Sequence, residues 1–299
     1  MPYQAARFEF AASRYSGALP AIGCDGLVPG AALDLTHWQG NHTPLEFKAD
    51  TSTEIALKFA ASPESARWAG AVVVNNHFDT DGILSAWVLL DPEHRRCCRE
   101  LMIAAAEAGD FDEWPAFERG LWLDAAIRAL ANDAADDAES YARVLPQLPE
   151  LAHHIDERRD LWGAEWEQLQ RSVAALKNGQ LQAERYGQIG VMRHAPGEPE
   201  APGPLLAREF LLGARRYLLA FDRGDRTYTY RYERPRYAWA ETVVRPACPA
   251  PDADALAREL GPAWTTEDLP GMTGIAQTLL PITDNPALIA ARLVHLDPH

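Results

Sequence analysis

The segment from Trp68 to Leu90 constrains the fold more than any other part of this 299-residue chain. It begins with the apolar run AVVV, whose β-branched residues favour a strand that is buried on both faces. The polar loop NNHFDTDG follows, and the apolar stretch ILSAWVLL after it is typical of a helix. Strand, polar loop and helix form the first half of a βαβ unit, so the pattern predicts an α/β protein with a parallel sheet.

The polar loop carries three possible metal ligands at alternate positions, His77, Asp79 and Asp81. Alternate side chains of an extended chain share one face, and imidazole and carboxylate groups together hold divalent cations. Open α/β sheets bind ligands beyond the carboxyl ends of their strands, and the N-terminus of the following helix, reached through Gly82, favours an anion. The loop therefore predicts a metal beside a phosphate, although short Asp-x-Asp elements also form Asx-turns and helix caps.

The sequence VVVNNHFDTDGILSA resembles motif I of the DHH phosphoesterase superfamily, HxDxDG between a strand and a helix. The superfamily includes exonucleases, nano-RNases, cyclic-dinucleotide phosphodiesterases, exopolyphosphatases and pyrophosphatases. The resemblance implies that His77, Asp79 and Asp81 bind Mn²⁺ or Mg²⁺ and that a metal-activated water attacks phosphorus. It also implies an Asp in a second motif, for which Asp110 in AEAGDFDEW is the nearest candidate, although a helix rather than a strand is predicted before it.

Two other parts of the superfamily pattern are not matched. Its third motif is Asp-His-His after a strand, whereas this chain has HHID, from His153 to Asp156, inside a predicted helix. We expect that element to make a surface or interdomain contact. The glycine-rich signature of the second domain has a faint echo in DLPGMTG, where Gly271 and Gly274 would contact substrate. Two alternatives therefore stay open: a degenerate binding protein without catalysis, and a metal enzyme that acts on a non-phosphate substrate.

Two further segments offer site residues. The predicted hairpin RTYTYRYERPR places Arg231 among tyrosines, where it would bind a phosphate or stack on a base, or simply belong to a half-exposed hairpin. The segment LDLTHWQGNHTP would either line the same crevice as the metal or form a polar turn. Its polar candidates are Asp34, His37, Asn41 and His42.

The remaining pattern predicts two domains. Residues 1–194 should form an α/β domain with three layers around a parallel sheet, mostly helical over 110–179, with one long helix over 150–178. The Pro- and Gly-rich stretch 195–204 should be a linker. Residues 205–299 should form a smaller α/β substrate domain, with a loop at DLPGMTG.

The charge balance limits the classes of molecule that the protein is expected to bind. Asp and Glu number 43 against 28 Lys and Arg, so the formal net charge is −15. Such a surface repels duplex DNA, long RNA and anionic membranes, but it permits a small anionic substrate held by a metal. The four scattered cysteines, including the neighbours Cys97 and Cys98, lack the CxxC spacing of zinc sites and suit a reducing cytosol. Without a recognisable signal peptide or transmembrane run, we expect a cytoplasmic protein, with a homodimer as one option for its assembly.

Overall fold

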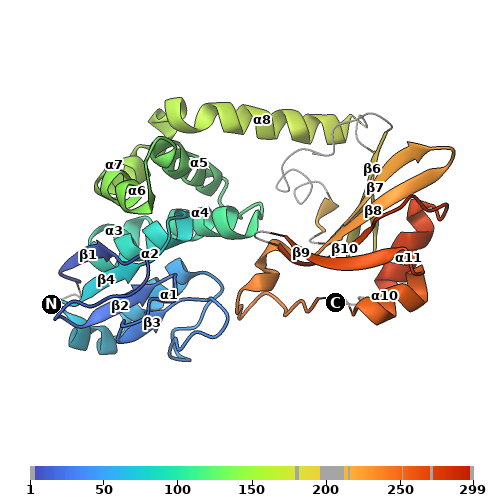
Figure 1. The fold of residues 1–299 in the computed structure, drawn as a ribbon. Helices are drawn as coiled ribbons and strands as arrows, with labels where there is room; N and C mark the ends of the chain where they lie inside the picture. Colours follow the sequence, from blue (N-terminus) through green and yellow to red (C-terminus); the bar gives the residue numbers. More distant parts are fainter. Residues whose placement is uncertain are drawn as a thin grey trace. The chain divides into compact units, whose positions relative to one another are not determined.

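The computed structural model describes residues 4–178, 182–195, 212–214, 216–250, 252–269 and 272–296. The chain divides into two compact units (Figure 1). The N-terminal unit comprises Met1–Trp166 together with Ala240–Arg245, and the C-terminal unit comprises Glu167–Trp239 and Pro246–His299. Among the described residues, no helix combines the length and the apolar character that crossing a membrane requires.

A four-stranded parallel sheet, in the order β1-β4-β2-β3, forms the base of the N-terminal unit. Its strands are β1 (Arg7–Phe10), β2 (Ala21–Cys24), β3 (Leu33–Leu35) and β4 (Val72–Asn75). The predicted AVVV strand is confirmed as β4: Val73 packs into one buried apolar cluster and Val72 and Val74 into another, so both faces are covered. Because the strands are parallel, the residues that follow β2, β3 and β4 meet at one edge of the sheet.

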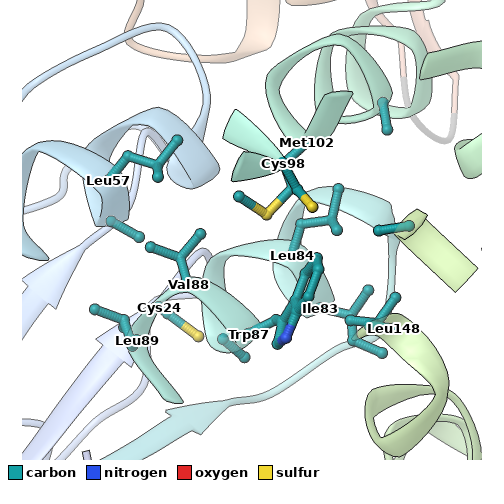
Figure 2. Packing of buried hydrophobic residues seen from close by; sticks show 14 of the residues in the cluster. Cys24, Leu57, Ile83, Leu84, Trp87, Val88, Leu89, Cys98, Met102 and Leu148 are labelled. Carbon is teal, nitrogen blue, oxygen red and sulfur yellow. The ribbon is translucent and has the colours of Figure 1, made fainter. Parts of the chain in front are cut away.

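Helices make up most of the rest of this unit. They are α1 (Ser52–Ala61), η1 (Pro63–Trp68), α2 (Thr80–Leu90), α3 (His94–Cys97), α4 (Arg99–Phe111), α5 (Arg119–Ala131), α6 (Asp137–Val144), η2 (Leu145–Gln147), α7 (Leu148–His153), η3 (Ile155–Glu157) and α8 (Arg159–Lys177), which continues into the C-terminal unit. The predicted helix ILSAWVLL is confirmed as α2. It is buried over most of its surface, and its Leu84 and Trp87 lie in the same core as Met102 of α4 (Figure 2).

The single helix expected over 150–178 is interrupted in the structure. Helix α7 ends at His153, the short turn η3 follows, and α8 begins at Arg159. The interruption is packed into the core, because the buried indole of Trp162 donates a hydrogen bond of 2.7 Å to the carbonyl oxygen of Ile155. The HHID element therefore spans the end of one helix and a 3₁₀ turn instead of lying within one helix.

The C-terminal unit is built on a six-stranded mixed sheet in the order β5-β6-β7-β8-β10-β9. Its elements are β5 (Gln182–Tyr186), β6 (Ile189–His194), β7 (Arg216–Gly224), β8 (Thr227–Glu233), η4 (Arg236–Trp239), α10 (Ala253–Leu260), β9 (Trp264–Leu269), β10 (Met272–Thr278) and α11 (Pro286–Leu296). The β7–β8 hairpin is confirmed. The expected loop over 268–274 is instead largely strand, because β9 reaches Leu269, β10 begins at Met272, and the two pair antiparallel.

The two units do not divide where the sequence suggested. Strands β5 and β6 precede residue 195, yet β6 pairs with β7 in the C-terminal sheet, and the boundary falls inside α8. The expected linker 195–204 lies outside the described residues except for Ala195, so a linker there stays a prediction. The α/β class and the smaller second unit are observed, whereas the three-layer arrangement stays a prediction.

Candidate metal centre

Six imidazole and carboxylate side chains converge at the carboxyl edge of the parallel sheet. They form two sets, which we call the carboxylate clusters, and the possible ligand atoms within each set lie within 4.8 Å of one another. The first cluster is Asp25, His77 and Asp79, and the second is Asp25, His37, Asp81 and Asp110. Asp25 belongs to both clusters, so the whole arrangement depends on its position.

Asp25 directly follows β2 and is fully buried. Its backbone adopts a left-handed φ of 63°, which is uncommon outside glycine, and the hydroxyl of Thr36 donates a hydrogen bond to its carbonyl oxygen. Oδ2 lies 2.8 Å from Nε2 of His77, and Oδ1 lies 3.6 Å from Nε2 of His37. The two oxygens thus face different clusters, and neither accepts a hydrogen bond of good geometry among the described residues.

The first cluster is the more exposed of the two. His77 and Asp79 lie between β4 and α2, and their side chains are 25% and 40% exposed. Asp79 caps α2, since its Oδ1 accepts a hydrogen bond of 2.7 Å from the amide of Gly82, while its Oδ2 lies 3.1 Å from Nε2 of His77. Burial acts to lower the pKa of His77, but the adjacent carboxylates of Asp25 and Asp79 raise it to about 11.

The second cluster surrounds Nε2 of His37, which follows β3. Nδ1 of His37 lies 2.6 Å from the carbonyl oxygen of Asp50, which can only accept, so Nδ1 carries a proton and Nε2 is directed at the carboxylates. Nε2 lies 3.2 Å from Oδ2 of Asp110, in the last turn of α4, and 3.7 Å from Oδ2 of Asp81. Burial acts to lower the pKa of His37, but Asp110 and Asp81 raise it to about 10.

The N-terminus of α1 holds Asp81 in place. Its two carboxylate oxygens accept hydrogen bonds of 2.6 Å and 2.7 Å from the amides of Ser52 and Thr53, which have no partner within their own helix. Burial and the charge of Asp25 nevertheless raise the pKa of Asp81 to about 7. Burial and neighbouring carboxylates also raise the pKa of Asp110. Burial opposes ionisation of Asp25 as well, but His77 and His37 lower its pKa, so in the metal-free protein the imidazoles balance the charge of this carboxylate.

Glycine is required where the backbone passes closest to Asp25. A Cβ atom at Gly82 would lie 2.6 Å from Nδ2 of Asn75 and 3.0 Å from Oδ2 of Asp25. A Cβ atom at Gly26 would lie 2.5 Å from Oδ1 of Asn75. Side chains at these two positions would displace the groups that line the centre, which explains the Asp-Gly pairs at residues 25–26 and 81–82.

A segment from far along the chain, Ala240–Arg245, packs beside the second cluster, and we call it the strap. The Asp50 carboxylate accepts hydrogen bonds from the backbone amides of Val244 and Arg245, at 2.8 Å and 3.1 Å, and from Nη1 of Arg245 at 2.7 Å. Burial opposes ionisation of Asp50, but these donors hold its pKa below the usual value. The strap is thereby fixed to the start of α1.

The strap also contacts the histidine of the second cluster and its surroundings. The amide of Glu241 donates a hydrogen bond of 2.7 Å to the carbonyl oxygen of His37. The guanidinium of Arg245 lies 4.7 Å from the centre of the Phe111 ring, which in turn lies 5.8 Å from the His37 imidazole. The strap therefore supports His37 through its backbone and its ring.

The structure brings four predicted residues together: His77, Asp79, Asp81 and Asp110. The three loop residues do not form one ligand set on an extended chain, however. Helix α2 begins at Thr80, so Asp81 points into the second cluster, while His77 and Asp79 belong to the first. At the N-terminus of α2, which we expected to favour an anion, the amide of Gly82 donates its hydrogen bond to Asp79.

Other predicted residues lie elsewhere. Arg231 lies in β8 of the C-terminal unit, where its Nε is 3.0 Å from the Glu233 carboxylate. Gly274 lies in β10, and Gly271 lies outside the described residues. From the HHID element, His154 lies near Glu150 and Glu157, and Asp156 pairs with Arg119, so both are outside the carboxylate clusters.

Sequence reasoning missed Asp25 and left His37 as one of two alternatives. Strand β2, with the sequence AIGC, is short, contains glycine and shows no alternation, so its pattern does not mark the residue that follows it. The sequence does contain one repeated signal, an Asp-Gly pair that comes after an apolar run. Asp25-Gly26 directly follows AIGC, and Asp81-Gly82 ends the polar loop that follows AVVV.

Comparison with known proteins places the chain in a family and detects a distant structural likeness. The model of a family of unknown function (DUF6687) matches residues 6–278, so the chain belongs to that family. No curated protein matches the chain. Among solved structures, it is similar to the pGpG-specific phosphodiesterase PggH from Vibrio cholerae, at 13% sequence identity and a TM-score of 0.45, over 93% of this chain and 83% of that chain.

Proposed function

We propose that this protein is a metal-dependent hydrolase of a small phosphoester or phosphoanhydride, with Mn²⁺ or Mg²⁺ as its cofactor. One observation carries the proposal: the two oxygens of a single buried carboxylate, Asp25, face two adjacent clusters of imidazole and carboxylate groups. Enzymes that transfer phosphoryl groups commonly hold two ions about 3.5–4 Å apart and bridge them with a carboxylate. The motif I resemblance of His77, Asp79 and Asp81 supports the same reaction class.

The donor set fits such ions. Oxygen and imidazole ligands suit Mn²⁺ and Mg²⁺, and among the described residues neither buried oxygen of Asp25 accepts a hydrogen bond of good geometry. His77 and Asp79 would bind one ion, His37, Asp81 and Asp110 the other, and Asp25 both. When bound, the ions would supply an activated water and neutralise charge on the phosphoryl oxygens.

The protein's own residues orient these ligands. The Asp50 carbonyl oxygen fixes the His37 tautomer so that Nε2 is available, which is a common arrangement behind a metal-binding histidine. The amides of α1 fix both oxygens of Asp81. His37 would supply the imidazole that the superfamily pattern expects from an Asp-His-His motif.

The net charge of the chain and the exposure of the first cluster limit the class of substrate that we propose. The net charge of −15 opposes binding of long nucleic acids, so we infer a mononucleotide, a short oligonucleotide or a similar small anion. The exposed side chains of the first cluster, His77 and Asp79, give such a substrate access from solvent. A cytoplasmic location, proposed from the sequence, suits the four cysteines, which are all free.

The test is hydrolysis by the full chain, stripped with a chelator and reloaded with Mn²⁺ or Mg²⁺. Substrates would be an activated phosphodiester, short oligonucleotides, pyrophosphate and nucleotides. We expect activity only in the reloaded protein and a loss of at least about 100-fold in Asp81→Asn, because a ligand of the second ion is removed.

Asp34→Asn is the matched control, since Asp34 lies within the neighbouring strand β3 but outside both clusters, where its carboxylate accepts a hydrogen bond of 3.3 Å from the amide of His42. It should keep the activity of the unmodified chain. Two equivalents of bound Mn²⁺ without hydrolysis of any of these substrates would contradict the phosphate reaction and favour a non-phosphate substrate or a binding protein.

A further inference from the structure

A second group of metal-binding side chains lies outside the carboxylate clusters. Cys97 ends α3, Cys98 lies between α3 and α4, and His153 ends α7. The two Sγ atoms are 3.4 Å apart, and all three possible ligand atoms lie within 4.8 Å of one another. We call these three residues the thiol cluster. The sequence spacing gave no zinc motif, because the third ligand comes from the interruption of the helical segment.

The geometry of the two thiols suits a shared ion. In a tetrahedral zinc site with Zn–S bonds of about 2.3 Å, two sulfur atoms lie about 3.8 Å apart. The observed separation differs from that value by only a few tenths of an ångström. Both cysteines are free thiols, and a disulfide would require a separation of about 2.05 Å. Small side-chain rotations are therefore enough to bind one ion.

The surroundings fix the cluster on one side and leave it open on the other. Cys98 is buried in the core beside Met102 (Figure 2). The His153 ring packs edge-on against His94, at 5.0 Å between ring centroids, and Nδ1 of His94 lies 2.6 Å from the Asp91 carboxylate. Cys97 and His153 themselves are exposed.

A pocket of about 510 Å³ adjoins the cluster, which leaves room for a fourth ligand. The residues that line it include both cysteines, His153 and three arginines, Arg96, Arg99 and Arg119. A site with three protein ligands keeps one position for water or another small ligand. The arginines would favour an anion there.

We infer that Cys97, Cys98 and His153 form a binding site for a soft divalent cation of the Zn²⁺ type, separate from the Mn²⁺ or Mg²⁺ centre. Thiolate and imidazole ligands select zinc-like ions, whereas carboxylates select harder ones. On binding, each thiol loses its proton to solvent and forms one metal–sulfur bond, so no oxidant or reductant takes part. The inference does not depend on the proposed hydrolase activity.

The test uses Co²⁺ as a spectroscopic substitute for Zn²⁺ in the reduced, chelator-stripped full chain. Sulfur ligation to Co²⁺ produces a near-ultraviolet charge-transfer band, which the sulfur-free carboxylate clusters cannot produce. With the carboxylate clusters first filled with Mn²⁺, we expect this band to saturate at one bound Co²⁺ per chain and to disappear when Zn²⁺ displaces that ion. Cys97→Ser should abolish it, and His153→Ala should weaken Co²⁺ affinity by at least about 10-fold.

His154→Ala is the matched control, since the neighbouring imidazole is exposed and outside the cluster, and it should titrate like the unmodified chain. Because Cys98 is buried, Cys98→Ala would be checked for folding by circular dichroism, while the exposed Cys97 gives the cleaner variant. Absence of the band in the unmodified chain, or an undiminished band in both Cys97→Ser and Cys98→Ala, would overturn the inference.

Discussion

The carboxylate clusters and the thiol cluster are built in opposite ways within one unit. The carboxylate clusters take ligands from the ends of three strands and from two helices, and Asp25, His37 and Asp81 are almost completely buried. The thiol cluster takes two adjacent residues and one helix end, and only Cys98 is buried. The first arrangement is fixed at the sheet edge, and the second by the burial of Cys98 and by the contact of His153 in α7 with His94 in α3.

The difference shows how a metal site without its ion affects the stability of the fold. Burial and the charge of Asp25 raise the pKa of Asp81 to about 7 in the metal-free clusters, so ionising this carboxyl group there is unfavourable. Neutral thiols carry no such penalty, and burial raises the pKa of Cys98 to about 12. We therefore expect the carboxylate clusters, but not the thiol cluster, to destabilise the metal-free fold.

The largest expected effect separates the two kinds of site. Asp25→Asn should abolish Mn²⁺ binding at both carboxylate clusters and reduce hydrolysis by at least about 100-fold, because the shared ligand is lost. The Co²⁺–thiolate band should be unchanged. Conversely, Cys97→Ser should keep hydrolysis within about twofold of the unmodified chain. Calorimetry measures Mn²⁺ binding at the carboxylate clusters, and absorbance measures the Co²⁺–thiolate band. Loss of the band in Asp25→Asn would show that the two kinds of site are coupled.

An intermediate effect is expected from the strap, which packs beside the second carboxylate cluster and contacts His37. Arg245→Met should lower the free energy of unfolding by about 3–5 kcal/mol, because it leaves the buried carboxylates of Asp50 and Glu113 without their cation. Mn²⁺ affinity should fall by about 10- to 100-fold through displacement of His37. Urea unfolding and Mn²⁺ titration measure the two effects.

Arg143→Met provides the control for that variant, because Arg143 forms an exposed ion pair with Glu139 on α6. Such pairs contribute about 0–1 kcal/mol. Equal destabilisation by both substitutions would show that the strap contributes no more than a surface contact.

The smallest effect concerns pH. A carboxyl group whose pKa is raised on folding binds its proton more tightly in the folded chain than in the unfolded chain. Its contribution to stability therefore falls as the pH rises from the pKa of the unfolded chain to that of the folded chain, which is about 7 for Asp81. The metal-free chain should therefore melt at lower temperature at pH 7 than at pH 5, with a smaller decrease in Asp81→Asn. Mn²⁺ should remove most of the difference, because the ion replaces the protons. Melting curves with and without Mn²⁺ test this, and an identical pH dependence in both chains would contradict it.

Local sequence was sufficient where a structure depends on neighbouring residues. The β4–loop–α2 segment follows from its apolar runs and polar loop. The N-terminus of α1 follows from its cap, since the hydroxyl of Thr51 accepts the Glu54 amide at 3.2 Å. The predicted ligands His77 and Asp79 come from such a segment, so motif and structure agree on their place at the end of β4.

Local sequence was insufficient where distant contacts decide. Strand β2 has only four residues and forms because β4 and β3 pair on either side of it, so no pattern marked Asp25. The position of His37 depends on Asp50 and on the strap, more than 200 residues later. The thiol cluster depends on the interruption between α7 and α8, which the buried bond from Trp162 stabilises.

The strap has a consequence for the order in which the protein is made. The N-terminal unit reaches Trp166 and then lacks one part, Ala240–Arg245, until about 80 more residues have been synthesised. At about 5–20 residues per second, translation delays that part by roughly 4–16 s. During this interval Asp50 and the backbone of His37 are without the partners that Arg245 and Glu241 later supply. A nascent chain stalled before the strap should therefore be more sensitive to proteases around α1 than one stalled after it.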